Sequence, residues 1–220
     1  NHIEALLFDS RENLWVGTEG GGVDRMVNSG EGSSQQNYFV HYRHDPADPS
    51  SIASDTVRVI APGRGGTLWI GTGNGLNRYD PQSESFGVFH EKDGLPNEYI
   101  YGILEDDQGR LWIGTLDGLD LLDRSTGRFH RYSYDPGDPH SLNNDTVWDI
   151  YQDRSGVVWL GTGGGVCKVN DVASAFTHYR QGADPLGQGP GTEQIIGAGP
   201  GSVPGLSDRP RRSLPAPGQR

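Results

Sequence analysis

The sequence predicts an all-β protein made of four similar antiparallel sheets. Near-copies of one string recur along the chain, at 14–18 (LWVGT), 68–72 and 111–115 (LWIGT) and 158–162 (VWLGT). Their tryptophans are 54, 43 and 47 residues apart, and self-similarity near this period is the signature of a repeat architecture. Glycine and proline supply 34 and 14 of the 220 residues, which favours many turns over long helices. We therefore expect each copy to be one structural unit.

Each unit is predicted to contain four strands. The first is an apolar segment ending six positions before the tryptophan, and the second is the tryptophan string, whose aliphatic neighbours favour a buried strand. The third strand follows a glycine-rich corner. The fourth carries two aromatic residues three positions apart, namely Phe39 with Tyr42, Phe86 with Phe89, Phe129 with Tyr132, and Phe176 with Tyr179.

A tight turn is predicted between the first two strands of each unit. Gly66, Gly109 and Gly156 each lie three positions before a tryptophan, where a hairpin needs a residue with positive φ, and the first copy has Glu12 there. The first strands end in acidic residues, except that the second copy has Gly63. Repetition at one phase favours bonding to turn N–H groups over acid/base catalysis for these residues, which are Asp9, Asp106, Asp107 and Asp153.

Four antiparallel strands per unit, with aromatic and glycine residues at fixed phase, describe a β-propeller blade. A β-solenoid has much shorter coils. The expected blades are residues 1–44, 45–92, 93–134 and 135–182. Residues 183–220 are rich in glycine and proline and are expected to be disordered or an aberrant end. Because no initiator Met or signal peptide precedes Asn1 and the last link meets no further tryptophan string, we expect an open arc of a larger ring.

Charge and composition restrict the partners. The net charge of −11 opposes nonspecific attraction to nucleic acid or an anionic membrane, and no apolar run is long enough to cross a bilayer. The single Cys167 excludes an intrachain disulfide. We therefore expect neither nucleic-acid binding nor membrane contact within this segment.

Several strings imitate catalytic or metal-binding motifs. The glycine-rich corners at 71–75 and 161–165 lead into strands, whereas a phosphate-binding loop needs a helix behind it. His41 and His44 are three apart, so along a strand they face opposite sides and do not form a metal pair. Cys167 is expected to be a packed thiol. No catalytic residue, metal or cofactor is predicted.

The tryptophans divide into two groups. The four motif residues, Trp15, Trp69, Trp112 and Trp159, are expected to pack between adjacent blades as structural core. Trp148 differs, because it aligns with Glu4, Arg58 and Tyr101 at a variable position of the first strand, which lines the channel of a propeller. Packing within the channel and ligand recognition both remain open for this position.

Ligand binding is expected on the face that carries the links between blades, because loops on a rigid scaffold carry function. This nominates the channel residues Arg58, Tyr101 and Trp148 with the corner residues Glu19, Asn74 and Asp117. Aromatic rings stack on sugars and polar groups bond hydroxyls, so a saccharide or another small ligand is the expected partner.

The string LWIGT-x-x-GL, the Phe-x-x-Tyr pair and the Asp-Pro or Asp-Gly-Leu-Pro links resemble the two-component regulator propeller repeat, over roughly residues 2–184. The resemblance implies a non-catalytic sensing region of a bacterial receptor, in the periplasm or otherwise outside the cytoplasm. It further implies neighbouring blades, a downstream histidine kinase or diguanylate cyclase module outside this chain, and a homodimeric parent receptor.

Two alternatives stand beside the sensor interpretation. One is a structural propeller that binds a partner chain on a flat face. The other is a lyase of the streptogramin-inactivating type, which also has a propeller fold and would need catalytic and metal-binding side chains at the ring centre. The aligned residues Glu4, Arg58, Tyr101 and Trp148 do not form such a set.

Overall fold

The computed structural model of the chain describes residues 2–29, 36–124, 126–171, 175–180 and 194–196. Four antiparallel sheets follow one another, and in each sheet the strands pair in chain order. This confirms the predicted all-β propeller segment. Blade 1 contains β1 (Ile3–Phe8), β2 (Leu14–Thr18), β3 (Val23–Ser29) and β4 (Gln36–Tyr42). Blade 2 contains β5 (Val57–Pro62), β6 (Leu68–Thr72), β7 (Gly75–Asp80) and β8 (Ser85–Phe89).

The second half of the chain repeats this pattern. Blade 3 contains β9 (Ile100–Glu105), β10 (Leu111–Thr115), β11 (Gly118–Asp123) and β12 (Arg128–Tyr132). Blade 4 contains β13 (Val147–Gln152), β14 (Val158–Thr162), β15 (Gly165–Asp171) and β16 (Ala175–Arg180). The 3-10 turns η2 (Arg64–Gly66) and η3 (Glu91–Asp93) lie in loops. Most of the predicted aberrant end, 183–220, lies outside the described residues, although Gln194–Ile196 form β17 beside β16.

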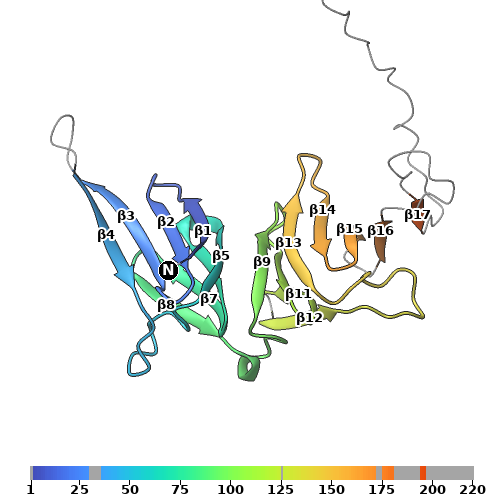
Figure 1. Cartoon of the computed structure of the whole chain (residues 1–220), viewed down its shortest axis with the longest axis horizontal. Helices are drawn as coiled ribbons and strands as arrows, with labels where there is room; N and C mark the ends of the chain where they lie inside the picture. Colours follow the sequence, from blue (N-terminus) through green and yellow to red (C-terminus); the bar gives the residue numbers. More distant parts are fainter. Residues whose placement is uncertain (1, 30–35, 125, 172–174, 181–193, 197–220) are drawn as a thin grey trace, which may run out of the picture.

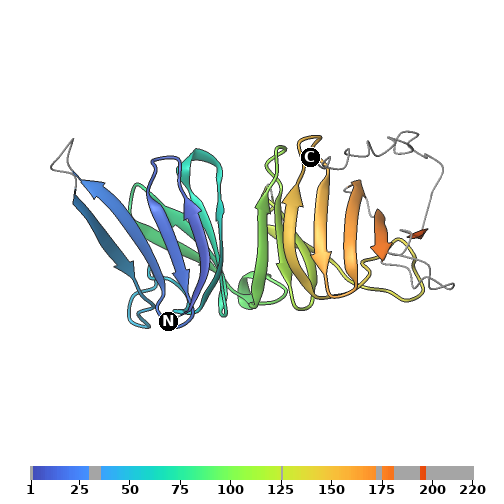
Figure 2. The ribbon, with the colours of Figure 1, turned by 45° about the horizontal axis from the view of Figure 1, so that its top comes forward.

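The four blades form an arc (Figure 1). Their first strands contact each other in series, β1 with β5, β5 with β9 and β9 with β13. Figure 2 shows the links between blades along one side of the arc and the hairpins between first and second strands along the other. The first strands therefore line the inner wall, and the long links form one rim beside it.

Each blade has two different apolar faces, and the contact between two neighbouring blades buries one face of each. Its tail face, which meets the following blade, carries the motif tryptophan and the aliphatic residue after the glycine corner, such as Trp15 and Val23 of blade 1, both 0% exposed. Its head face, which meets the preceding blade, carries aliphatic residues of the first two strands. In blade 2 these are Ile60, Leu68 and Ile70, which pack against the tail face of blade 1. Blades 2 and 3, and blades 3 and 4, repeat the arrangement.

The glycine of each tryptophan string lets the next blade approach closely. A Cβ on Gly17 would lie 2.5 Å from Val57 Cγ1, and one on Gly71 would lie 2.6 Å from Ile100 Cγ2. Such distances are far below van der Waals contact, so any side chain here would force the blades apart. The Trp-x-Gly spacing thus combines a large ring with an empty site for the neighbour's first aliphatic residue.

A carboxylate connects the hairpin turn to the indole in three blades. Trp15, Trp112 and Trp159 each donate Nε1–H to Oδ2 of the aspartate six positions earlier at 2.9 Å. The Oδ1 atoms of these aspartates accept turn amide N–H groups, as predicted from the repeated acids. Hydrogen bonds from Ser155 and Trp159 lower the pKa of Asp153 to about 2.

The first-copy turn has the same shape without glycine. Glu12 has φ 63°, close to the values of 80°, 80° and 85° at Gly66, Gly109 and Gly156. The left-handed conformation is costly for a residue with a Cβ. The Asp9 carboxylate holds Glu12 in this conformation, because it accepts hydrogen bonds from the backbone N–H groups of Arg11 and Asn13 on either side of Glu12.

Blade 2 replaces the carboxylate with one from another blade. Gly63 stands where the aspartate would be, and Trp69 Nε1 instead donates to Glu105 Oε2 of blade 3 at 3.0 Å. Arg124 Nη2 lies 2.8 Å from the same oxygen, and the Glu105 side chain is only 3% exposed. Burial alone would raise the pKa of Glu105, but hydrogen bonds from Arg124 and Trp69 outweigh burial and lower that pKa.

We predict that Glu105→Ala lowers the free energy of unfolding by about 2–4 kcal/mol, because it leaves the buried Trp69 N–H and the Arg124 guanidinium without their acceptor. Urea unfolding followed by tryptophan fluorescence measures the change. The pKa of Glu105 is depressed in the folded state, so its contribution is present at neutral pH and is lost as pH falls below about 4. Glu91→Ala, at an exposed position of η3, is the control; an equal loss in both variants would contradict the assignment.

A buried acid in blade 3 lacks the partner that its counterpart in blade 2 has. Asn77 of β7 accepts the Ala53 N–H at 2.8 Å and donates to the carbonyl oxygens of Ile70 and Gly75. Asp120 occupies the same place in β11, and the link residue aligned with Ala53 is Pro96, which has no N–H. Asp120 is 0% exposed, and its Oδ2 has no hydrogen-bond partner.

The environment of Asp120 makes stability depend on pH. Burial raises the pKa of Asp120 to about 7, against the opposing effect of Arg131, whose Nε lies 3.3 Å from Oδ1. The pKa of Asp120 in the folded state lies above its value of about 3.9 in the unfolded state. Protonated Asp120 therefore contributes fully to the free energy of unfolding below about pH 3.9, and this contribution is lost as the pH rises through about 7. Ionisation of Asp120 therefore lowers the free energy of unfolding above neutral pH.

We predict that Asp120→Asn raises the free energy of unfolding by about 1–2 kcal/mol at pH 8 and by much less at pH 4.5, since an amide does not ionise and can donate as Asn77 does. Urea unfolding at both pH values measures the difference. The mirror substitution Asn77→Asp should destabilise the protein, increasingly so as pH rises. A gain from Asp120→Asn that is the same at both pH values would refute this account.

Candidate functional site

Three residues predicted from the variable channel position form one continuous row across three blades. Arg58 of β5 places its guanidinium 5.0 Å from the ring centroid of Tyr101 of β9. Tyr101 in turn meets Trp148 of β13 edge to face, with centroids 5.0 Å apart at 82°. Trp148 is 48% exposed although it is large and apolar. The inner wall therefore presents a cation and two aromatic rings side by side.

A β-bulge at the same place in every blade produces this row. The register between first and second strands shifts between Val57 and Val59, opposite Ile100 and Gly102, and between Val147 and Asp149. The residue inside each shift is the row residue, and blade 1 has Glu4 at its own shift. A bulge leaves its extra residue unpaired and turns the side chain away from the regular alternation. The variable side chain is thus released from the core of an otherwise constant strand.

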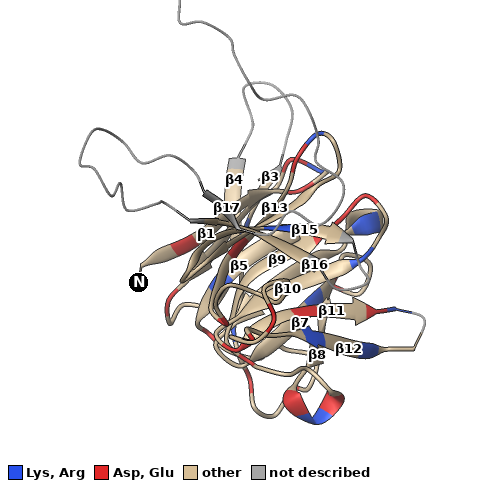
Figure 3. Cartoon of the chain, turned by 90° about the vertical axis from the view of Figure 1, so that its right-hand side faces the viewer, with Lys and Arg blue, Asp and Glu red and all other residues tan. Residues whose placement is uncertain are grey.

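The electrostatics of the row are local. Acidic residues occur in many loops with basic residues among them (Figure 3), so attraction of a ligand depends on the side chains at the site. Arg58 is half-buried, and its Nε is buried without a hydrogen-bond partner. A guanidinium over an aromatic face contributes about 0.5–2 kcal/mol and is held in a fixed orientation. Arg58 is therefore a preorganised donor at the edge of an aromatic surface.

The corner residues lie on the same rim but are engaged with their own surroundings. Gly73 N–H bonds the Thr56 carbonyl, which places the glycine corner of blade 2 beside the start of β5. Asn74 donates to the Ala53 carbonyl at 3.2 Å, and Asp117 pairs with Arg131 at 2.5 Å. The structure thus places Asn74 and Asp117 beside the inner wall without joining them to the row of Arg58, Tyr101 and Trp148.

Blade 1 carries one group of side chains with metal-ligating atoms. His2, Glu4 and Glu19 offer ligand atoms that lie within 4.8 Å of one another, and all three residues are exposed. His2 Nδ1 is 3.4 Å from Glu19 Oε2. An ion pair explains this contact, and within the described residues no further observation at this place indicates a cation.

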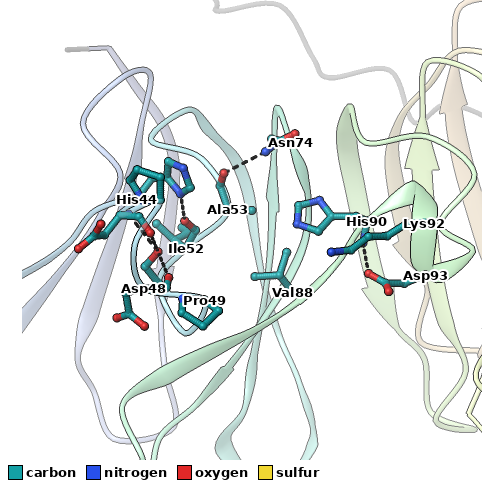
Figure 4. A pocket seen from close by; sticks show the side chains of 13 residues that line it. His44, Asp48, Pro49, Ile52, Ala53, Asn74, Val88, His90, Lys92 and Asp93 are labelled. Atoms are coloured by element: carbon teal, nitrogen blue, oxygen red, sulfur yellow. Dashed lines mark hydrogen bonds between the residues drawn. The ribbon is translucent and has the colours of Figure 1, made fainter.

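A polar pocket that the sequence did not predict lies on the same rim, against blade 2 (Figure 4). It has a volume of about 360 Å³, and the first and second links line much of it, with His44, Asp48, His90, Lys92 and Asp93. The His44 ring bonds the Ile52 carbonyl at 2.8 Å, while the His41 ring bonds Asp24, so these two histidines diverge as expected. Only the clustering of polar residues in two separate links could have indicated this pocket.

The fold and the row define a β-propeller segment that carries a cation and two aromatic rings in contact on its inner wall. The family model described as two component regulator propeller matches residues 94–117 and 141–164, in blades 3 and 4. The predicted resemblance is therefore confirmed, and these two segments match the two-component regulator propeller repeat. No curated protein matches the sequence.

Solved structures agree on the fold. The extracellular domain of a hybrid two component system from B. thetaiotaomicron is 20% identical, with a TM-score of 0.57 over 82% of this chain and 31% of that one. The extracellular domain of a one component system from the same organism is 21% identical, with a TM-score of 0.62 over 80% and 25%. Virginiamycin B lyase from Staphylococcus aureus is 12% identical, with a TM-score of 0.57 over 81% and 55%.

The chain spans about a third or less of the two extracellular domains. At these identities the likeness establishes the propeller fold, and the neighbours include both these extracellular domains and a lyase. In the described part of the chain, no helix has the length and apolarity that a membrane crossing requires.

Proposed function

We propose that this chain is a sensing segment of a bacterial receptor of the two-component type, located outside the cytoplasm, and that it binds a saccharide on its inner wall. The observation that carries the proposal is the row of Arg58, Tyr101 and Trp148, which three β-bulges expose at the same place in three blades. The extracellular location of the two B. thetaiotaomicron domains supports the location.

The chemistry of the row suits a sugar. Trp148 leaves about half of its surface open and packs against Tyr101 in a T-shaped contact, so apolar ring surface is available for the C–H groups of a pyranose ring. Arg58 adds fixed N–H donors for hydroxyl or carboxylate oxygens. A preorganised aromatic surface with a few polar groups is the usual composition of a small-molecule site.

The same composition favours binding over catalysis. The lyase among the structural neighbours makes an enzyme the alternative function. A lyase needs a general base at the ring centre, and the touching residues Arg58, Tyr101 and Trp148 provide a cation and two aromatic rings instead. The aligned Glu4 is exposed beside His2 at the end of the arc. We therefore assign no reaction to the row.

Binding can be converted into a signal because the ligand contacts several blades. One sugar over the row would touch β5, β9 and β13, which belong to three separate sheets. A ligand that prefers one arrangement of the blades shifts the population toward it. The proposed receiver is a kinase or cyclase module of a homodimeric parent receptor.

We predict that Trp148→Ala weakens binding of an oligosaccharide at least about tenfold, because the substitution removes the stacking surface. Isothermal titration calorimetry with a neutral maltooligosaccharide and an acidic oligogalacturonate measures the effect, and Arg58→Gln should weaken the acidic ligand more than the neutral one. Tyr151→Ala is the matched control, because Tyr151 lies on the same strand and is 61% exposed. Affinity for both sugars unchanged by Trp148→Ala would exclude the row as the binding site.

A further inference from the structure

The polar pocket over blade 2 has complete walls within this chain. One wall is link 1 (residues 44–53), which leads from blade 1 into blade 2, and the other is the start of link 2 (residues 90–93), which leads on to blade 3. Val88 of β8 lies between the two walls (Figure 4). Blade 2 has a neighbour on each side, so the space does not arise from a missing blade. Its volume of about 360 Å³ is within the range of small-molecule sites.

A change within the repeat explains why this space is open. Val88 lies opposite Asn77 in the pairing of β7 with β8, and at the same register blades 3 and 4 have Arg131 and His178. Arg131 forms ion pairs with two aspartates of its own blade, and the His178 ring bonds the Ser141 carbonyl at 2.6 Å. Valine has neither the length nor a polar atom to make such bonds. The polar groups around Val88 therefore face a cavity.

The two walls carry opposite charges that do not touch. Link 1 contributes the carboxylates of Asp45 and Asp48, and link 2 contributes the Lys92 ammonium beside the His90 ring. Hydrogen bonds from the Ser50 side chain and backbone lower the pKa of Asp48, so this carboxyl is ionised at neutral pH. Within the described part of the chain, no ion pair includes Asp45, Asp48 or Lys92. Their charges remain open to a ligand between the walls.

Hydrogen bonds hold both walls in place. In link 1, Asp45 and Asp48 each accept one backbone N–H on Oδ1, which leaves Oδ2 outside the turn bond. In link 2, Asp93 Oδ2 accepts the His90 N–H at 3.1 Å and caps η3, so Asp93 is already engaged. The His90 ring is fixed in turn, with Nδ1 3.2 Å from Glu98 Oε1. A ligand that binds to such preformed walls loses little affinity to the ordering of the protein.

We propose that this pocket binds a free α-amino acid, with its ammonium group toward Asp48 and its carboxylate toward Lys92. An α-amino acid carries both charges on one small molecule, whereas a simple cation or anion would satisfy one wall only. Pro49 and Val88 supply apolar surface for an aliphatic side chain. A metal ion is disfavoured, because in the described residues the one group of closely spaced metal-ligating atoms lies in blade 1. The inference does not depend on sugar binding by the row.

Isothermal titration calorimetry with L-valine tests the proposal, and two analogues that each lack one charge are the matched controls. Isobutylamine is L-valine without the carboxylate, and isovalerate is L-valine without the ammonium group. We expect L-valine to bind and both analogues to bind at least about tenfold more weakly, because each loses a charge-assisted hydrogen bond. Absence of L-valine binding at millimolar concentration would overturn the proposal, as would an analogue that binds equally well.

Two charge variants locate the ligand. Asp48→Asn and Lys92→Gln should each weaken L-valine binding at least about tenfold, because each removes the charge that one end of the ligand meets. Asp138→Asn is the control for the first, since Asp138 accepts the same kind of turn N–H in link 3. Arg128→Gln, at an exposed position of β12, is the control for the second, because it removes a positive charge away from the pocket. Both controls should bind as the wild type does.

Val88→His tests the open space itself. It gives blade 2 the residue type that blade 4 has at this register, so the imidazole should occupy the pocket and abolish L-valine binding. Circular dichroism checks the fold of each variant, and if Val88→His does not fold, the two charge variants decide. A folded Val88→His chain with wild-type affinity, or charge variants that behave like their controls, would place the amino acid elsewhere and refute the assignment.

Discussion

The close approach of each tryptophan-string glycine to the first residue of the next blade is the constraint on which the structure depends. Val57 and Ile100 lie so close to Gly17 and Gly71 that neither glycine could carry a side chain. This contact brings the indole of one blade over the aliphatic strands of the next, and burial of these groups supplies most of the cohesion between sheets. Each blade interacts mainly with its neighbours, as in other repeat proteins.

The same constraint positions the row of Arg58, Tyr101 and Trp148. Once Val57 is fixed over Gly17, the strand resumes its pairing at Val59, and the residue between them is left in a bulge. That residue is Arg58, and Tyr101 and Trp148 arise in the same way in the next two blades. A packing requirement of the core therefore creates one unconstrained position per blade on the inner wall. Variation at that position changes the side chains on the inner wall without disturbing the fold.

Polar groups show how the repeats tolerate departures from their pattern. Loss of the turn aspartate at Gly63 is offset by Glu105 from the following blade, so the Trp69 N–H remains bonded. No neighbour replaces the N–H that is missing at Pro96, so Asp120 Oδ2 has no hydrogen-bond partner, and burial raises the pKa of Asp120. A buried donor or acceptor that lacks a hydrogen-bond partner lowers the stability of the fold. Each departure from the repeat pattern is therefore either compensated by a residue of a neighbouring blade or makes the stability depend on pH.

The sequence by itself determined the elements of the fold. The tryptophan strings, the glycines before them and the aromatic pairs each act within one blade, over distances of a few residues, so their pattern predicts strands, turns and blades. It also identified Arg58, Tyr101 and Trp148, because a variable position inside a constant frame is visible in an alignment of the repeats. Their contact was not visible, nor was the polar pocket between the links.

Tertiary structure alone decided the contacts between blades. The partner of Trp69 is Glu105, and Oδ2 of Asp120 has no hydrogen-bond partner where Pro96 replaces a residue with an N–H. Both relations join residues that are distant in sequence. Leu6 and Ile60 are aliphatic residues at the same position of their blades, yet Leu6 is exposed and Ile60 is buried. The difference depends on whether another blade lies next to them. A repeat specifies its own hydrogen bonds and both of its faces, but burial is a property of the pair, so only the assembled arc shows which faces are buried.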